Sequence, residues 1–270
     1  MNTYSVSEAP LGVWGYICGI MAVIYPLSEG EFTVGRDKQF IPFHLETDVL
    51  NDRTTGSLLV EVQPFLIITD KDVMVLDTGL GFNNKDGVLQ IHDNIRECGY
   101  EPAAVTKVLL SHLHKDHAGC LVFTDEQGMV HTTFPNADYY IYRPEADYAL
   151  EIGYPSYHPE DIEPLLSSSQ VKWLDGESGT IDGYIHFMHS GGHCPQHIVY
   201  LIDDGKDKIF FGGDEAPQMK QMKLKYIAKY DYDGKKAMHL REQYAEQGKA
   251  GDWQFLFYHD IKSPIARLPK

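Results

Sequence analysis

The hydrophobic and polar positions in the first third of the chain predict mostly β-strands. Short apolar or alternating runs bounded by turn residues are typical of strands in a partly buried sheet. Such runs cover residues 19–27, 57–69, 73–77 and 105–111. One further segment has apolar residues at helical spacing and ends on a glycine, which predicts a helix over residues 83–99.

The remaining two thirds of the chain alternate predicted strands with helices. Apolar runs predict strands at residues 139–142, 171–174, 184–188, 198–203, 209–211 and 253–258. A proline near its first position favours a helix over residues 144–151, and residues 235–247 have the clearest amphipathic pattern. This order predicts an α/β sandwich, in which two sheets pack face to face and helices lie outside. Because no linker or repeat interrupts the pattern, we expect residues 1–270 to form one domain.

The charge balance disfavours some partners. The chain has 39 Asp and Glu against 23 Lys and Arg, for a formal net charge of −16. Such an acidic surface repels phosphate backbones and anionic lipids, so we expect neither nucleic acid nor membrane as a partner.

Cysteine usage and the N-terminal pattern favour the cytoplasm. The four cysteines, Cys18, Cys98, Cys120 and Cys194, form no CxxC pair and no regular spacing, which indicates reduced thiols. The apolar stretch over residues 11–25 is too short to span a membrane, and glycines interrupt it. Since no Lys or Arg precedes Arg36, the charged start of a signal peptide is missing. We therefore interpret this stretch as a core strand.

The strongest chemical signal follows the predicted strand that ends near residue 111. His112, His114, Asp116 and His117 place four metal-ligand side chains within six positions. Alternate residues at a strand end point the same way, so His112 and His114 can hold one ion. The chain then turns, and the other two side chains can face a second ion. With 13 histidines in the chain, a hydrophilic loop with chance histidines is the alternative, but four such residues after a buried strand favour a metal site.

This segment resembles the HxHxDH signature of the metallo-β-lactamase superfamily. Other elements that resemble the same family follow in the expected order: Asp77-Thr78-Gly79, Gly191-Gly192-His193, Gly212-Gly213-Asp214 and His259-Asp260. The resemblance implies the metallo-β-lactamase fold, with mixed sheets in an αββα sandwich. It also implies a centre of two divalent ions, zinc in the first place, with iron, manganese or cobalt as alternatives.

The resemblance also assigns roles to residues far from the signature. It makes His193 the third ligand of the first ion, Asp214 a bridge between both ions, and His259 a ligand of the second. Asp77 would support the site through a hydrogen bond to a ligand. Taken alone, Asp214 also fits an ordinary turn and His259 an ordinary strand end. Their positions after apolar strands favour the ligand roles, because a strand end holds a side chain rigidly.

Two alternatives exist around His193. His189, His193 and His197 are four residues apart, as two ligands on a helix would be, but the nearby glycines and Pro195 disfavour a helix. We therefore take His193 as the ligand and His197 as a supporting residue. Cys194 could offer a thiolate, but the motif already supplies His193, and we do not expect Cys194 to bind metal.

The expected chemistry is hydrolysis by a hydroxide that bridges the two ions. Asp116 would act as a ligand and as the hydrogen-bond acceptor that orients this hydroxide. About 60 residues precede the strand pair, and residues 230–233 and 253–260 follow a pattern similar to the N-acyl homoserine lactonases and organophosphorus hydrolases. This similarity implies a small lactone or ester as substrate, with a homodimer as a possible assembly.

One departure from that branch concerns the residue three positions after Asp214. The best-known lactonases have a tyrosine there, whereas this chain has Pro217. The hydroxyl would then come from elsewhere, and the candidates are Tyr226, Tyr230 and Tyr232.

Three other functions remain open from the sequence. A phosphotriesterase or thioesterase would use the same site on another bond. An iron-dependent oxidoreductase can share the fold with a different metal. A non-catalytic binding module is disfavoured because the ligand set is complete.

Overall fold

The first of two large sheets is mixed. The computed structural model describes residues 21–269. This sheet contains β1 (Val23–Pro26), β5 (Phe65–Ile68), β6 (Val73–Leu76), β7 (Lys107–Leu109), β10 (Asp138–Tyr142) and β11 (Val171–Leu174). They lie in the order β1-β5-β6-β7-β10-β11. The pairs β1–β5 and β5–β6 are antiparallel, whereas the pairs from β6 to β11 are parallel.

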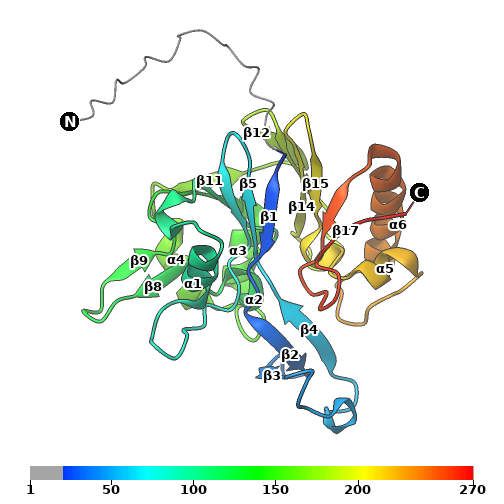
Figure 1. Cartoon of the computed structure of the whole chain (residues 1–270), viewed down its shortest axis with the longest axis horizontal. Helices are drawn as coiled ribbons and strands as arrows, with labels where there is room; N and C mark the ends of the chain where they lie inside the picture. The colour runs from blue at the N-terminus through cyan, green and yellow to red at the C-terminus, as the bar shows by residue number, and fades with distance from the viewer. Residues whose placement is uncertain (1–20, 270) are drawn as a thin grey trace, which may run out of the picture.

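The second sheet lies beside the first (Figure 1). It contains β12 (Ser178–Ile181), β13 (Ile185–His189), β14 (Ile198–Asp203), β15 (Lys208–Phe211), β16 (Gln254–Leu256) and β17 (Ile265–Arg267), and the strands follow each other in that order. Only β15 and β16 are parallel to each other among these neighbours.

Alternation along the strands builds the layers. Side chains on the inner faces of both sheets form one core, which includes Phe65, Ile67, Met74, Leu76, Ile185, Phe187, Tyr200, Ile202 and Phe211. Leu66 and Val75 alternate with these residues and point to the opposite side, where they join the core beneath the helices. The arrangement confirms the predicted αββα sandwich.

Helices cover the outer faces of both sheets (Figure 1). The first sheet packs against α1 (Gln90–Glu97), α3 (Arg143–Ile152) and α4 (Pro159–Leu166). The second packs against α5 (Met219–Lys223) and α6 (Gly234–Gly251). None of the helices within residues 21–269 combines the length and the apolar character needed to cross a lipid bilayer.

The prediction of one strand over residues 57–69 was wrong. The segment forms β4 (Leu58–Val62) and β5, which belong to different sheets. Pro64 separates them, because proline has no N–H to donate to a continuous ladder. β4 pairs with β2 (Gly30–Val34), which also pairs with β3 (Phe40–Pro42), in a small sheet that extends from the sandwich.

Several other boundaries differ from the prediction. The helix expected over residues 83–99 begins only at Gln90, because Asn84 Oδ1 accepts the N–H groups of Asp86 and Val88 and forms a loop. The sequence pattern missed several elements, most of which are strands of only three to five residues and too short to show a clear period. They are α4, β2, β3, β12, β17, and the hairpin of β8 (Val122–Thr124) and β9 (Val130–Thr132). Cys18 and the start of the first predicted strand lie outside the described residues, whereas Cys98, Cys120 and Cys194 are free thiols.

Candidate metal centre

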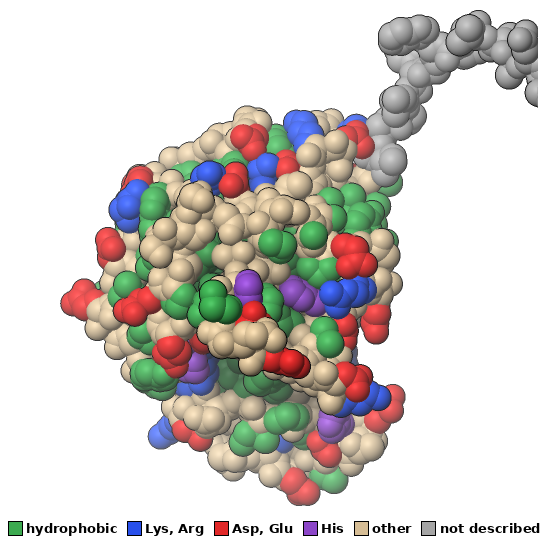
Figure 2. Space-filling view, turned by 90° about the vertical axis from the view of Figure 1, so that its left-hand side faces the viewer, with side chains coloured by type: hydrophobic (Ala, Val, Ile, Leu, Met, Phe, Trp, Pro, Cys, Tyr) green, Lys and Arg blue, Asp and Glu red, His purple; other side chains and the backbone are tan. Residues whose placement is uncertain are grey.

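The chain brings the predicted ligands together where strands of both sheets end. His112 follows β7, Asp214 follows β15 and His259 follows β16. His193 lies in the loop between β13 and β14. The carboxyl ends of the parallel pairs thus converge on one site, where the strand ends hold each side chain. Figure 2 shows histidine side chains near the middle of one molecular face, with carboxylates and apolar side chains around them.

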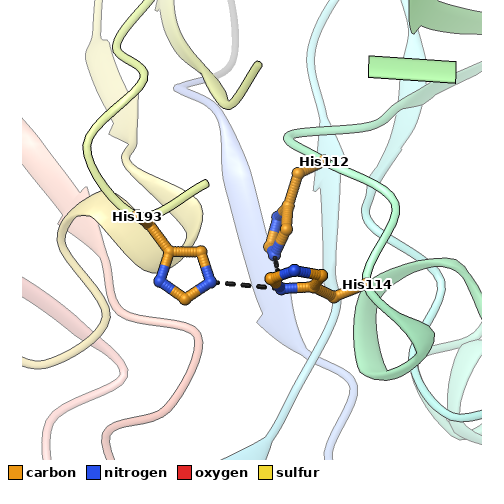
Figure 3. Close-up of side chains that lie close together, drawn as sticks. All are labelled: His112, His114 and His193. Atoms are coloured by element: carbon orange, nitrogen blue, oxygen red, sulfur yellow. Dashed lines mark hydrogen bonds between the residues drawn. The ribbon is translucent and has the colours of Figure 1, made fainter. Parts of the chain in front are cut away.

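Three histidines form the first group. Nδ1 of His114 lies 2.9 Å from Nε2 of His112 and 3.1 Å from Nε2 of His193. The three rings point toward one another although His193 comes from a loop 79 residues away from His114 (Figure 3). Their nitrogens are close enough to hold one metal ion.

Asp116, His117 and His259 form the second group, which could also hold an ion. Asp116 and His117 lie on the short helix α2 (Lys115–Ala118), directly after His114. Nε2 of His259 lies 3.4 Å from Oδ2 of Asp116, and Nε2 of His117 lies 3.6 Å from the same oxygen. All three residues are buried.

Asp214 lies between the two groups. Its Oδ2 is 3.3 Å from Nε2 of His193 in the first group, and its Oδ1 is 3.0 Å from Nε2 of His259 in the second. Gly213 allows this approach: its φ is +48°, and a Cβ there would come within 2.6 Å of the Ser111 hydroxyl oxygen. A carboxylate with one oxygen toward each group has the placement expected of a bridging ligand.

Hydrogen bonds at the far ring nitrogens fix the tautomers of three of these histidines. Nδ1 of His117 bonds to Asp77 at 2.7 Å, and Nδ1 of His193 bonds to Asp231 at 3.0 Å. Nδ1 of His259 donates to a backbone carbonyl oxygen at 2.6 Å. An imidazole that donates through Nδ1 carries a lone pair on Nε2 when it is neutral.

The same logic applies to His112. The Ser111 hydroxyl donates to Asp77 Oδ2 at 2.7 Å, so its oxygen is left to accept from Nδ1 of His112 at 3.0 Å. Nε2 of His112 then also carries a lone pair. The centre therefore gathers imidazole lone pairs and two carboxylates, and among the described residues the buried His117 Nε2 and Asp214 Oδ1 have no hydrogen-bond partner. This donor set fits divalent cations such as zinc.

The electrostatics of the cluster also favour a bound cation. Burial and the neighbouring imidazoles hold the pKa of His112 and of His114 well below 6.5, so both rings are neutral donors. Burial opposes a charge on His117, but Asp214 and Asp116 outweigh it and raise the pKa of His117 well above 6.5. Burial likewise acts against an ionised Asp214, but His259, His117 and His193 keep its pKa well below 3.8. The second group thus attracts positive charge.

The two residues predicted to support the site lie behind the ligands. Asp77 is fully buried, adopts a φ of +55° and accepts bonds from Ser111 and His117. Nε2 of His197 accepts the backbone N–H of Asp214 at 3.2 Å, so this nitrogen is engaged and His197 holds the Asp214 loop. The Cys194 thiol lies against Glu145 at 3.6 Å and belongs to neither ligand group.

Sequence reasoning missed four buried charged residues around the centre. They are Glu145, Glu215, Asp231 and Arg241. Glu145 accepts the backbone N–H of Leu113 inside the signature segment at 3.0 Å, and burial raises its pKa to about 7. Two signals were available: Glu215 directly follows Asp214, and Asp231 lies in the lactonase-like segment 230–233. Nothing near Glu145 or Arg241 in the sequence indicates their contacts, because these arise from distant parts of the chain.

Comparison with known protein families identifies the family to which the chain belongs. Residues 59–261, which include every predicted ligand, match the family described as the metallo-beta-lactamase superfamily. The chain belongs to this superfamily. The matched range also includes both groups of histidine and aspartate side chains described above.

Curated proteins similar to the chain include lactonases. An N-acyl homoserine lactonase from Bacillus sp is 26% identical over 175 residues, which cover 57% of this chain and 63% of that protein. The N-acyl homoserine lactonase AttM from Agrobacterium fabrum is 29% identical over 119 residues, which cover 41% of this chain and 40% of AttM. The matched segments therefore span less than two thirds of these relatives.

Solved structures share the fold over nearly the whole chain. A probable metal-dependent hydrolase from Staphylococcus aureus superposes with a TM-score of 0.71 at 21% identity and covers 92% of this chain and 97% of its own. AidC, a dizinc quorum-quenching lactonase in complex with a product, superposes with a TM-score of 0.65 at 20% identity, covering 93% of this chain and 92% of its own. At these identities the likeness establishes the fold.

Proposed function

We propose that the protein is a metal-dependent hydrolase with two divalent ions, zinc in the first place, that opens small lactones or esters. The observation that carries this proposal is the placement of Asp214 between two ligand groups. One ion would be held by His112, His114 and His193, and the other by Asp116, His117 and His259, with Asp214 shared. Because the supporting contacts reach from residue 61 to residue 259, we also propose that the whole chain acts as one domain.

Such ions would supply a water that is acidic enough to act as a hydroxide near neutral pH and would polarise the substrate carbonyl. The residues of the chain supply orientation and proton transfer. The carboxylate of Asp116 faces the centre and can accept the proton that the attacking water gives up. A bond forms between the water oxygen and the carbonyl carbon, the ring or ester C–O bond breaks, and the proton passes to the leaving alkoxide.

A neighbouring cavity favours a neutral substrate. Its volume is about 300 Å³, and none of the predicted ligands lines it. Glu61 links it to the centre, because this lining residue accepts the Nδ1–H of His259 through its backbone carbonyl. The described lining combines the rings of Phe32, Phe43 and Phe82 with three glutamates and contains no Lys or Arg. This surface suits an apolar acyl group and, without Lys or Arg, offers no charge partner to an anionic one. The names of the Bacillus and Agrobacterium relatives then favour N-acyl homoserine lactones as the substrate class.

Tyr230 is our candidate for the hydroxyl that Pro217 lacks. Its ring centroid lies 6.1 Å from that of His193, and its hydroxyl contacts the Gln221 amide at 3.2 Å. Tyr230 and Tyr226 are equally exposed, at 40%, but among the described residues neither Tyr226 nor Tyr232 makes a ring contact with a predicted ligand histidine. Among the three tyrosines, Tyr230 is thus the one whose ring contacts a predicted ligand.

The test is proton release by zinc-loaded protein across N-acyl homoserine lactones of increasing chain length. Release that becomes faster as the acyl chain grows would support a lactonase with an apolar groove. No release from protein confirmed to hold two metal ions would reject lactones, and phosphotriesters and thioesters would be assayed next. Protein that binds no metal would reject the proposed function altogether.

A further inference from the structure

Three buried charges form an ionic cluster directly behind His193. Arg241 is 1% exposed, Glu215 is fully buried, and the Asp231 side chain is 1% exposed. We call these three residues the Arg241 cluster. They come from three places in the chain: helix α6, the short 3-10 helix η3 (Gly213–Glu215) that also carries Asp214, and the segment that precedes α6.

The two carboxylates of the cluster hold His193 on its ring and on its backbone. Asp231 Oδ1 accepts from Nδ1 of the ring at 3.0 Å. Glu215 Oε2 accepts the backbone N–H groups of Gly192 and His193 at 3.0 and 3.2 Å. A Cβ at position 192 would lie 2.2 Å from Glu215 Oε1, so only glycine permits this approach. The position of the His193 ring is therefore determined by the cluster rather than by its own loop alone.

Arg241 joins the segments that carry these carboxylates. Its Nη1 donates to the backbone carbonyl of Glu215 at 3.1 Å, and its Nη2 donates to the backbone carbonyl of Tyr226 at 2.6 Å. Nη1 also lies 3.9 Å from Oδ2 of Asp231. One guanidinium thus fixes the residue after Asp214 and the segment that presents Asp231 to His193. A lysine could not reach these groups at once, because its ammonium is a single point charge without the planar fork.

The Arg241 cluster is a poor way to stabilise the folded protein. Glu215 Oε1, Asp231 Oδ2 and Arg241 Nε are buried without a hydrogen-bond partner among the described residues. Desolvating charges that are incompletely hydrogen-bonded costs free energy, and apolar side chains of similar volume are often at least as stabilising. The contacts to His193 give the cluster a geometric role that apolar packing would not provide.

We propose that Asp231 and Arg241 are positioning residues, which orient His193 so that its Nε2 faces the ion shared with His112 and His114. The proposal rests on the two-metal function proposed above. Outer partners of metal-bound histidines commonly change metal affinity by about 10–100-fold. Among the predicted ligands Asp231 bonds only to His193, so its loss should weaken the ion of the first group selectively.

The experiment measures both metal affinities by competition with a chromophoric chelator, together with the visible spectrum of the cobalt-loaded protein. Asp231→Ala should weaken one ion by about 10–100-fold and leave the other within about threefold. Asp231→Asn should have a smaller effect, since its amide oxygen still accepts from His193. Arg241→Lys should fall between the wild-type protein and Asp231→Ala, and all three variants should change the spectrum of one cobalt ion. The control is Lys235→Met, which removes a charge from the exposed side of α6. It should change neither the metal affinities nor the cobalt spectrum.

Thermal unfolding of the metal-free variants separates positioning from a general structural role. Equal weakening of both ions, in parallel with a loss of metal-free stability, would overturn the proposal, and so would unchanged affinities in Asp231→Ala. If Arg241→Lys does not fold, the metal affinities of the near-isosteric Asp231→Asn still test the positioning role. A wild-type protein that binds no metal overturns the proposed function, whereas two tightly bound ions in every variant overturn only the positioning role.

Discussion

Nδ1 of His259 lies 2.6 Å from the backbone carbonyl oxygen of Glu61. The two residues are 198 positions apart, yet this bond fixes the ring of the last predicted ligand. It also connects the end of β16 with β4 of the small sheet, whose residues line the neighbouring cavity. The same contact therefore sets a ligand lone pair and the wall of the proposed substrate site.

Removal of His259 should release one ion and leave the other. In His259→Ala we expect one metal equivalent in place of two, because His112, His114 and His193 remain intact. Turnover should fall by more than about 100-fold, since even partners that only support a ligand cost up to that factor. Metal content by elemental analysis, measured with lactone turnover, checks this expectation. The matched control is His239→Ala, which removes an exposed histidine away from the cavity. Retention of two ions in His259→Ala would contradict the assignment.

Loss of either carboxylate at the centre should abolish turnover. Asp214 contacts both ligand groups, and Asp116 is the proposed proton acceptor. Asp214→Ala should weaken both ions, whereas Asp116→Ala should weaken chiefly the one near His259. Steady-state kinetics with saturating zinc distinguish lost chemistry from lost metal. Unchanged activity in both variants would exclude the two-metal mechanism.

His197 should affect the centre without binding metal. In His197→Phe, the buried N–H of Asp214 loses its acceptor, which should cost about 1–3 kcal/mol of stability. Metal affinity should fall by about 10–100-fold as the Asp214 loop relaxes. Denaturant unfolding and chelator competition measure the two effects. The control His186→Phe changes an exposed histidine and should alter neither stability nor metal affinity. A normal metal affinity in His197→Phe would show that the Asp214 loop does not need the bond to His197.

The buried carboxyl of Glu29 should make stability depend on pH. Burial raises its pKa to about 8, against the N–H groups of Leu80 and Gly81, which lower it. The folded state thus keeps a proton that the unfolded state releases near pH 4.5. The contribution of this proton to the free energy of unfolding is complete below pH 4.5 and is lost as pH rises to 8.

Glu29→Gln removes this dependence while keeping the shape of the side chain. We expect the variant to match the wild-type protein near pH 4.5 and to exceed its unfolding free energy by up to about 4 kcal/mol above pH 8. Urea unfolding of both proteins across this range provides the measurement, with the exposed Glu126→Gln as the control for surface charge. A constant difference between variant and wild type at all pH values would show that Glu29 is ionised in the folded state.

Much of the fold follows from local patterns in the sequence. The apolar runs over residues 139–142, 171–174 and 198–203 match β10, β11 and β14, since strand periodicity and turn residues act over short distances. The pattern failed at Pro64, where one apolar run divides between two sheets. It also missed short edge strands such as β12, whose stability depends on the neighbouring strand.

The sequence by itself determined the chemistry of the centre, because metal ligands form a small set of side chains and the segment 112–117 concentrates them. The sequence did not determine which contacts hold these side chains in place. The bond from His259 to Glu61 and the Arg241 cluster behind His193 join residues that no spacing rule connects. Only the tertiary structure decided which nitrogen of each ring faces the centre, because that choice depends on an acceptor contributed by a distant segment.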